Sequence, residues 1–341
     1  MNKSFWLVVV AIITILFACQ KADDLVEEYL ISFTKPKHFP EPHYNFPGNP
    51  INKERFELGK KLFYDPILSR DNTISCASCH IPENAFTHHG HDVSHGIDDR
   101  LGIRNSMTLT NLAWSKSFFW DGGVFDLDLF SVAPIENVVE MDEKLPNVIK
   151  KLNSSNTYPL LFEKAFGTRE IQSSHLLKAL SQFMLLLVSD QSKYDQVMRS
   201  EATFTAEEQA GYQLFQSKCN ACHQEPLFTD GSFRDNGIGR NPANDEGRFE
   251  ISQLDNDKLK FKVPTLRNLA FTQPYMHDGR FRTLESVINH YRREVQQTPN
   301  LDPLLRQEMG IKLSDLEVKQ LVAFLNTLND ETFIKNPLFR E

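Results

Sequence analysis

The sequence has no excess of basic residues and few cysteines for its length. Lys and Arg number 37 against 45 Asp and Glu, which gives a formal net charge of −8. No basic patch stands out, so a nucleic-acid partner is not expected. Five cysteines in 341 residues are too few for a disulfide-based scaffold. With 40% hydrophobic and 24% charged residues, the composition excludes a disordered chain and a polytopic membrane protein, and it allows two hydrophobic cores.

The N-terminus reads as an export signal. Residues 5–18 are almost wholly apolar, a stretch that is too short for a membrane span and suits a signal peptide. The four residues that end at Cys19 read LFAC and resemble a bacterial lipobox. We therefore predict a lipoprotein signal peptide over 1–18 and a lipid on Cys19, which would anchor the protein on the periplasmic side of the bacterial envelope. The alternative is an ordinary signal peptide and a soluble periplasmic protein.

Beyond Cys19, the chain divides into a linker and two related halves. Residues 19–50 are polar and then proline-rich, which predicts a tether. Residues 108–122 (TLTNLAWSKSFFWDG) and 265–279 (TLRNLAFTQPYMHDG) agree at seven of fifteen positions, at an offset of 157. Helical patterns are frequent and strand signals are scarce, so the predicted class is mainly α. We predict one module over 51–199 and a second over 200–341.

Each module contains a motif for covalent haem attachment. Cys76, Cys79 and His80 form one C-x-x-C-H motif, and Cys219, Cys222 and His223 form the other. In this pattern two thiols add to the vinyl groups of one haem, and the adjoining histidine becomes the proximal iron ligand. A thioredoxin-like pair or half of a zinc site would not explain a histidine directly after the second cysteine twice. The sequence therefore predicts two covalently bound haem c groups.

The repeat predicts that the two haems differ in their sixth ligand. Leu284, Val287, Ile288 and Tyr291 share one face of a predicted helix, so Tyr291 could reach the second iron. Met276 and His290 are the alternative ligands. Subtracting 157 from 291 gives Pro134, which has no atom that can bind iron. If the register extends that far, the first haem has an open or loosely closed distal side.

Two carboxylates near Pro134 are candidates for acid–base chemistry. A haem peroxidase needs a group that takes a proton from one peroxide oxygen and returns it to the other. Glu136 and Glu140 both lie in this segment. At most one of the two has this role, and the other is then a solvated surface acid.

These features together resemble the bacterial di-haem cytochrome c peroxidase and MauG family, over roughly residues 51–330. The resemblance implies two all-α cytochrome c-like domains, with the haems near the domain interface and a calcium ion between the domains. It rests on the two haem motifs and on six further segments: LGKKLFYDP at 58–66, GIRN at 102–105, FWDG at 119–122, EM at 140–141, VPTLRN at 263–268 and PYMHDG at 274–279.

Carried over position by position, the resemblance implies roles for five residues. Glu140 matches the family's catalytic glutamate, and Trp120 matches the tryptophan that lies between the haems. Asn105 matches a calcium ligand through its side chain. Thr272 and Pro274 match calcium ligands through their backbone carbonyls.

The sequence also departs from the family's peroxidases. Tyr291 falls where peroxidases carry an axial methionine and MauG-type members carry a tyrosine. Phe130 falls where many members have a distal glutamine. His95 lies closest to the displaceable histidine ligand of the first haem, in the histidine-rich loop 88–95. A solvated loop, or a zinc or copper site, is the alternative interpretation of that loop.

The predicted function is reduction of hydrogen peroxide to water by a cytochrome c peroxidase-type oxidoreductase. Electrons would come from a small cytochrome c or copper protein, and the first module would be peroxidatic while the second transfers electrons. One alternative is a MauG-like oxidase that modifies side chains of a partner protein, which Tyr291 favours. A second alternative is a dihaem electron carrier without catalysis. The sequence leaves the donor and the oligomeric state open, a homodimer included.

Overall fold

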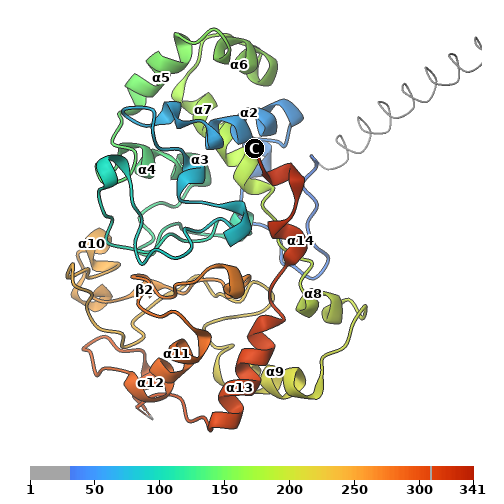
Figure 1. Cartoon of the computed structure of the whole chain (residues 1–341), viewed down its shortest axis with the longest axis vertical. Helices are drawn as coiled ribbons and strands as arrows, with labels where there is room; N and C mark the ends of the chain where they lie inside the picture. Colours follow the sequence, from blue (N-terminus) through green and yellow to red (C-terminus); the bar gives the residue numbers. More distant parts are fainter. Residues whose placement is uncertain (1–30, 308) are drawn as a thin grey trace, which may run out of the picture.

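The computed structural model describes residues 31–307 and 309–341, which form two stacked helical modules (Figure 1). The first module holds α2 to α7 and the second holds α9 to α13, with β1 and β2 as an antiparallel pair. The predicted mainly α class is confirmed. The bounds are α2 Lys53–Tyr64, α3 Leu127–Phe130, α4 Val132–Glu136, α5 Leu145–Asn153, α6 Tyr158–Phe166, α7 Ser173–Leu185, α8 Lys193–Met198, α9 Ala206–Lys218, α10 Phe249–Ser252, α11 Leu284–Asn289, α12 Pro303–Arg306, α13 Asp315–Asn326, α14 Glu331–Ile334, β1 Phe233–Arg234 and β2 Phe261–Lys262.

Short 3-10 helices and one π-helix join these elements. The π-helix spans His290–Glu294 and directly continues α11. The 3-10 helices are Phe46–Gly48, Pro66–Leu68, Cys76–Ser78, Pro82–Asn84, Ile97–Asp99, Leu112–Trp114, Asp255–Asp257, Leu269–Phe271 and Pro337–Phe339. Each haem motif thus lies in a tight turn that follows a longer helix, α2 in the first module and α9 in the second.

A close helix crossing organises each module. A Cβ atom on Gly59 of α2 would lie 1.8 Å from the carbonyl oxygen of Ala179 in α7. In the second module, a Cβ atom on Gly211 of α9 would lie 1.9 Å from the carbonyl oxygen of Gln320 in α13. Because no real side chain tolerates such distances, glycine is what lets each pair of helix backbones touch.

The repeat extends beyond the fifteen matched residues, as hydrogen bonds show. Phe118 N–H donates to Val124 O at 2.8 Å, and Tyr275 N–H donates to Phe281 O at 2.7 Å. Each residue of the second pair lies 157 positions after its counterpart in the first. Ser189 lies between the modules and bonds to the two equivalent asparagines. It accepts from Asn111 Nδ2 at its carbonyl, at 3.1 Å, and from Asn268 Nδ2 at its hydroxyl, also at 3.1 Å.

Residues 31–50 pack against the protein, so the prediction of a tether does not hold for this stretch. Ile31 and Phe39 are buried in the first core, and Phe33 and Phe46 pack against it. The indole of Trp114 donates to the carbonyl of Pro40 at 2.8 Å. The prolines resemble a linker in composition, but the apolar side chains between them bury enough surface to fix the segment. Residues 1–30, with the predicted signal peptide and Cys19, lie outside the described residues.

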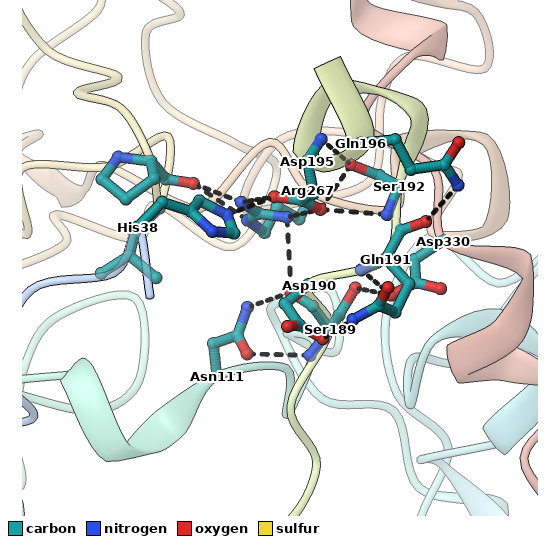
Figure 2. Close-up of polar contacts among 12 residues, drawn as sticks. His38, Asn111, Ser189, Asp190, Gln191, Ser192, Asp195, Gln196, Arg267 and Asp330 are labelled. Atoms are coloured by element: carbon teal, nitrogen blue, oxygen red, sulfur yellow. Dashed lines mark hydrogen bonds and ion pairs between the residues drawn. The ribbon is translucent and has the colours of Figure 1, made fainter. Parts of the chain in front are cut away.

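A buried ion pair joins this N-terminal segment to both modules (Figure 2). Arg267 and Asp195 have fully buried side chains and form two hydrogen bonds of 2.8 Å. His38 contributes a third contact, with its Nε2 2.8 Å from Asp195 Oδ1. Burial opposes ionisation of Asp195, but the hydrogen bonds and charge of Arg267 lower its pKa overall. The pair therefore remains charged and holds three stretches of chain together.

Segments that come just before and just after the second module in the sequence pack into the core of the other module from the one expected. Tyr194 in α8 packs into the second core, although it precedes the predicted boundary at 199/200. Phe333, Ile334 and Phe339 pack into the first core, although they follow the last long helix of the second module. In Figure 1 the chain accordingly returns from α13 through α14 to the first module.

In residues 31–307 and 309–341 no helix has the length and apolar character needed to cross a membrane.

Candidate haem sites

The first haem motif presents an oriented histidine beside two free thiols. Cys76 and Cys79 are not in disulfides, and His80 follows them directly. His80 Nδ1 lies 2.7 Å from the backbone carbonyl of Phe86. Burial lowers the pKa of His80, so the neutral ring is favoured. With the proton on Nδ1 and bonded to this carbonyl, Nε2 keeps a lone pair for iron, as expected for a proximal ligand.

The second motif repeats this arrangement. His223 Nδ1 lies 3.2 Å from the carbonyls of both Phe228 and Pro264. Cys219 and Cys222 are free thiols that line a largely apolar cavity together with His223. The residues present therefore fit a covalently attached haem at each motif.

The structure places two of the three candidate sixth ligands in the cavity of the second module. Tyr291 and Met276 both line it. Asn236 Nδ2 lies 3.3 Å from the Tyr291 hydroxyl and 3.6 Å from the Met276 sulfur, so both side chains reach the same point. Burial raises the pKa of Tyr291 to about 12. His290 is not among the lining residues, and its Nε2 lies 3.0 Å from the carbonyl of Asn236.

The π-helix after α11 explains how Tyr291 reaches the cavity. Thr283 caps α11 by accepting from Ser286 N–H, and Asp126 caps α3 in the same way by accepting from Asp128 N–H. Asp126 lies 157 positions before Thr283, so the register still holds at these caps. The modules diverge after them, because α11 continues into the wider helix over His290–Glu294. Such wide turns re-aim side chains and recur at functional sites.

In the first module the equivalent positions carry no group that can bind iron. Phe119 lies 157 positions before Met276, and Pro134 lies 157 positions before Tyr291. The ring of Phe119 stacks on Phe130, with centroids 4.7 Å apart. Phe130, which stands where many members have glutamine, is therefore a packing residue here.

Glu140 has the environment expected of an acid–base group. Its carboxyl is half-buried and accepts a hydrogen bond from Asn137 Nδ2 at 2.7 Å. Burial raises its pKa, and the hydrogen bond from Asn137 only partly opposes this effect. Burial raises the pKa of the Cys76 and Cys79 thiols, and the charge of the nearby Glu140 carboxylate raises it further. Glu140 thus lies beside the first haem motif.

Glu136 is engaged elsewhere. Its Oε1 accepts from the backbone N–H of Leu145 at 3.1 Å, at the start of α5, and Lys144 lies 3.5 Å away. These contacts lower its pKa. The geometry therefore favours Glu140 over Glu136 as the proton-transferring carboxylate.

Trp120 lies at the contact between the modules. Its Nε1 donates to the carbonyl of Asn105 at 2.9 Å, and its ring meets His277 edge to face at 6.4 Å. Trp120 also lines the cavity of the second module. His277 occupies the same place in the second repeat as Trp120 does in the first, so the pair lies near the local symmetry axis.

The three predicted calcium ligands lie on the wall of the large cavity of the second module. Asn105, Thr272 and Pro274 all line the same cavity. Asn105 Nδ2 donates to the carbonyls of His91 and Asp92, both at 3.1 Å, which turns Oδ1 to the opposite side. Side-chain and backbone oxygens are the ligands that calcium prefers, with water completing the shell. The donor set therefore fits calcium.

His95 lies beside the first haem motif, but its ring is engaged with its own loop. Its backbone carbonyl is 3.6 Å from the Cys79 sulfur, while its Nδ1 pairs with Asp99 at 2.8 Å. The rings of His88 and His91 stack with centroids 4.2 Å apart, and His95 meets His91 edge to face at 4.6 Å. In the described part of the chain no group of three His, Cys, Asp or Glu side chains could hold a metal ion. The zinc or copper interpretation of this loop therefore has no support, because the rings stack on one another.

The sequence assigned no role to Asn236, His277 or Lys262, although His277 is part of the family-like segment 274–279. Asn236 has no motif that would mark it. His277 and Lys262 could have been found through the repeat, as the counterparts of Trp120 and Asn105. Lys262 lines the cavity of the second module with its side chain almost fully buried.

Two modules, each with an oriented histidine beside a pair of free thiols, define a c-type cytochrome with two haem sites. Comparison with known proteins makes this more specific. Residues 53–203 match the family model described as di-haem cytochrome c peroxidase, and residues 208–329 match that of cytochrome c. The chain is 35% identical to the methylamine utilization protein MauG of Methylorubrum extorquens, over 88% of this chain and 84% of that protein. It is 33% identical to the cytochrome c551 peroxidase of Nitrosomonas europaea, over 85% of this chain and 84% of that protein.

A solved structure described as a MauG-like protein associated with microbial copper homeostasis is 30% identical and superimposes with a TM-score of 0.83. That match covers 90% of this chain and 98% of the other. The chain belongs to the di-haem cytochrome c peroxidase and MauG family and is a haem oxidoreductase. Its two cytochrome c-type modules imply two covalently bound haem c groups.

Proposed function

We propose that this protein reduces hydrogen peroxide to water at the haem site of the first module. The observation that carries the proposal is the asymmetry between two equivalent sites. Met276 and Tyr291 offer ligand atoms in the second module. In the first module Phe119 is the counterpart of Met276, and Pro134, which the offset of 157 aligns with Tyr291 beyond the last shared cap, has no atom that can bind iron. The first site is thus left accessible to a small oxidant.

Glu140 supplies the proton transfer in this proposal. Haem iron at the first site, when bound, supplies the coordination and reduction of peroxide. The Glu140 carboxylate accepts the proton from one peroxide oxygen and delivers it to the other, which departs as water. Its raised pKa makes it a stronger base than an ordinary glutamate, and Asn137 holds the carboxyl in one orientation. Overall, one peroxide takes up two electrons and two protons to give two waters.

The electrons are proposed to arrive singly from a small cytochrome c or copper protein through the second module. Trp120 supports this route by its place between the modules, where its ring contacts His277 and its indole N–H bonds to Asn105. Fixed contacts of this kind hold the ring in one position relative to both sites.

Replacing Glu140 by Gln tests the proposal. Glutamine keeps the shape and the contact with Asn137 but cannot accept the proton, so peroxide turnover should fall by roughly 10²–10⁴ fold. The measurement is the steady-state rate of peroxide-dependent oxidation of a reduced cytochrome c, normalised to haem content. Glu136→Gln is the matched control and should keep the wild-type rate. Wild-type turnover in Glu140→Gln would eliminate the role.

A second candidate function is oxidation of side chains on a partner protein. The buried Tyr291 on the π-helix favours it, as do the relatives named MauG. A phenolate ligand would stabilise oxidised iron at the second site, whereas a methionine would favour reduced iron. Tyr291→Phe should then change the low-spin spectrum of the ferric protein. An unchanged spectrum in Tyr291→Phe, together with a changed one in Met276→Leu, would assign the ligand to Met276 and remove this support.

We also propose that calcium binds at Asn105, Thr272 and Pro274. Removing calcium with a chelator should lower peroxide turnover, and re-adding calcium should restore it, while magnesium should not. Magnesium requires a smaller and more regular shell than two backbone carbonyls and an amide provide. Turnover that ignores the chelator would contradict the site.

We further propose export and lipid attachment at Cys19, which would place the enzyme on the periplasmic face of the bacterial envelope. The lipobox-like sequence before Cys19 supports this. Cys19→Ser should release the protein from the membrane fraction and abolish incorporation of labelled fatty acid. Membrane retention of that variant would contradict the anchor.

A further inference from the structure

The repeat pairs the side-chain ligand of the proposed calcium site with a lysine. Adding 157 to 105 gives 262, so Lys262 is the counterpart of Asn105. The backbone confirms the pairing, because Asn105 N–H donates to His277 O and Lys262 N–H donates to Trp120 O, both at 2.7 Å. The two acceptors are themselves counterparts. Asn105 and Lys262 therefore occupy equivalent places on the two sides of the module interface.

The carbonyl ligands have counterparts as well. Subtracting 157 from Thr272 and Pro274 gives Ser115 and Ser117. The ammonium of Lys262 donates to the carbonyl oxygen of Ser117, which is the counterpart of the proposed calcium ligand Pro274 O. The carbonyl position that would bind the proposed calcium ion on one side thus accepts from a protein ammonium on the other.

The surroundings of Lys262 are those of a cation held by neutral groups. Its side chain is almost fully buried, with 8% of the residue exposed. Burial lowers the pKa of its ammonium to about 8. The ring of Phe118 lies 5.9 Å from Nζ and adds a weak cation–π attraction. The dipole of the Ser117 carbonyl and the face of the Phe118 ring stabilise the ammonium here.

We infer that the Lys262 ammonium is a built-in replacement for a metal ion, at the place in the first repeat that corresponds to the calcium site of the second. The two sides of the interface thus each hold one cation, which is divalent on one side and monovalent on the other. One is supplied by an ion that can dissociate, and the other by a side chain that cannot leave. This inference rests on the proposed calcium site for its template.

Exchanging the two side chains tests the inference with the holoenzyme. Lys262→Asn removes the ammonium and supplies the amide oxygen that Asn105 provides on the other side, so it should create a second calcium site. Asn105→Lys should fill the first site with an ammonium and abolish calcium binding. The measurement is equilibrium dialysis with metal analysis, expressed as calcium bound per two haems. The expected values are about one for the wild type, two for Lys262→Asn and none for Asn105→Lys.

The outcomes separate the inference from the calcium proposal. A wild type with one calcium and a Lys262→Asn variant that still binds one would overturn the inference and keep the calcium site. A wild type without calcium and a Lys262→Asn variant that binds one would refute the calcium proposal and keep the inference. No calcium in either protein would overturn both.

A stability measurement covers the case in which Lys262→Asn folds poorly. A site that binds calcium only when folded raises the unfolding temperature as calcium is added. The unfolding temperature of Lys262→Asn should therefore rise with calcium concentration by more than that of the wild type. Lys262→Met, which has no oxygen ligand, should respond to calcium no more than the wild type does. Equal responses of the Asn and Met variants would count against the inference, as would failure of both Lys262→Asn and Asn105→Lys to fold with calcium present.

Discussion

The two modules share a backbone plan and differ at a few side chains that decide their chemistry. Both cross two helices at a glycine, both hold the proximal histidine through Nδ1, and both bond an asparagine to Ser189. The differences lie at positions 157 residues apart: Phe119 against Met276, Asn105 against Lys262, Thr110 against Arg267 and, beyond the point where the backbones diverge, Pro134 against Tyr291. The duplicated scaffold therefore leaves a small number of positions at which the two sites differ in the ligand atoms they offer.

Among equivalent positions of the two modules, Arg267 and Thr110 should differ most in how much a substitution lowers the free energy of unfolding. Arg267→Met would leave the fully buried Asp195 carboxylate without its bidentate partner, which typically costs about 3–5 kcal/mol. Thr110→Val removes only a hydroxyl that bonds to Thr108 at 2.6 Å, a loss of about 1 kcal/mol. Denaturant unfolding of the two variants measures the difference. Equal costs would show that the ion pair contributes no more than an ordinary hydrogen bond.

The helix crossings should behave alike in the two modules. Gly59→Ala and Gly211→Ala each place a methyl group against a backbone carbonyl, so each should destabilise by about 1–3 kcal/mol. Alanine otherwise favours a helix over glycine by about 1 kcal/mol, so the sign itself reports the close contact. Thermal unfolding gives both values, with the exposed Gln213→Ala in α9 as the control. A neutral or stabilising effect at either glycine would mean that the helices can separate there without cost.

The smallest expected effect is a pH dependence confined to the first module. Because burial raises the pKa of Glu140 above the ordinary 4.5, its carboxylate is lost on acidification at a higher pH than an ordinary glutamate. Peroxide turnover should therefore decline as pH falls through that raised pKa, while the residual rate of Glu140→Gln stays flat over the same range. Identical pH profiles of the two proteins would assign the acid limb to another group.

The raised pKa of Glu140 also predicts how the stability of the fold depends on pH. The folded protein binds the Glu140 proton more tightly than the unfolded chain, so the free energy of unfolding should fall as pH rises from 4.5 to the raised pKa. The difference between wild type and Glu140→Gln in denaturant unfolding isolates this contribution, and it should be small because the carboxyl is only partly buried.

Local signals in the sequence predicted much of this architecture. The sequence has capping boxes at Thr205 and Ser314, and these begin α9 and α13 because side-chain oxygens there satisfy the first free amides. The strongly apolar stretch over 174–188 largely coincides with α7. Each C-x-x-C-H motif holds its cysteines and histidine within five residues, so the sequence alone identified it, whereas the carbonyls that orient the histidines lie outside the motifs.

The features that depend on distant partners were not predictable in the same way. Proline content over 19–50 indicated a tether, but burial of Phe39 depends on Trp114, which is far along the chain. The return of α14 to the first core likewise depends on a surface that no local pattern reports. No local pattern marks Lys262, because its significance lies in its counterpart, Asn105, and in a carbonyl 145 residues away.

The docking of residues 31–50 limits how far the enzyme can stand from a membrane. With a lipid on Cys19, as proposed, only the stretch from Cys19 to Ile31 remains to span the gap. Even a fully extended backbone of that length reaches about 40 Å, comparable to the thickness of the bilayer itself. A redox partner would therefore have to bind close to the lipid surface. Lengthening the segment between Cys19 and Ile31 should increase the distance from the membrane at which the enzyme can bind its partner.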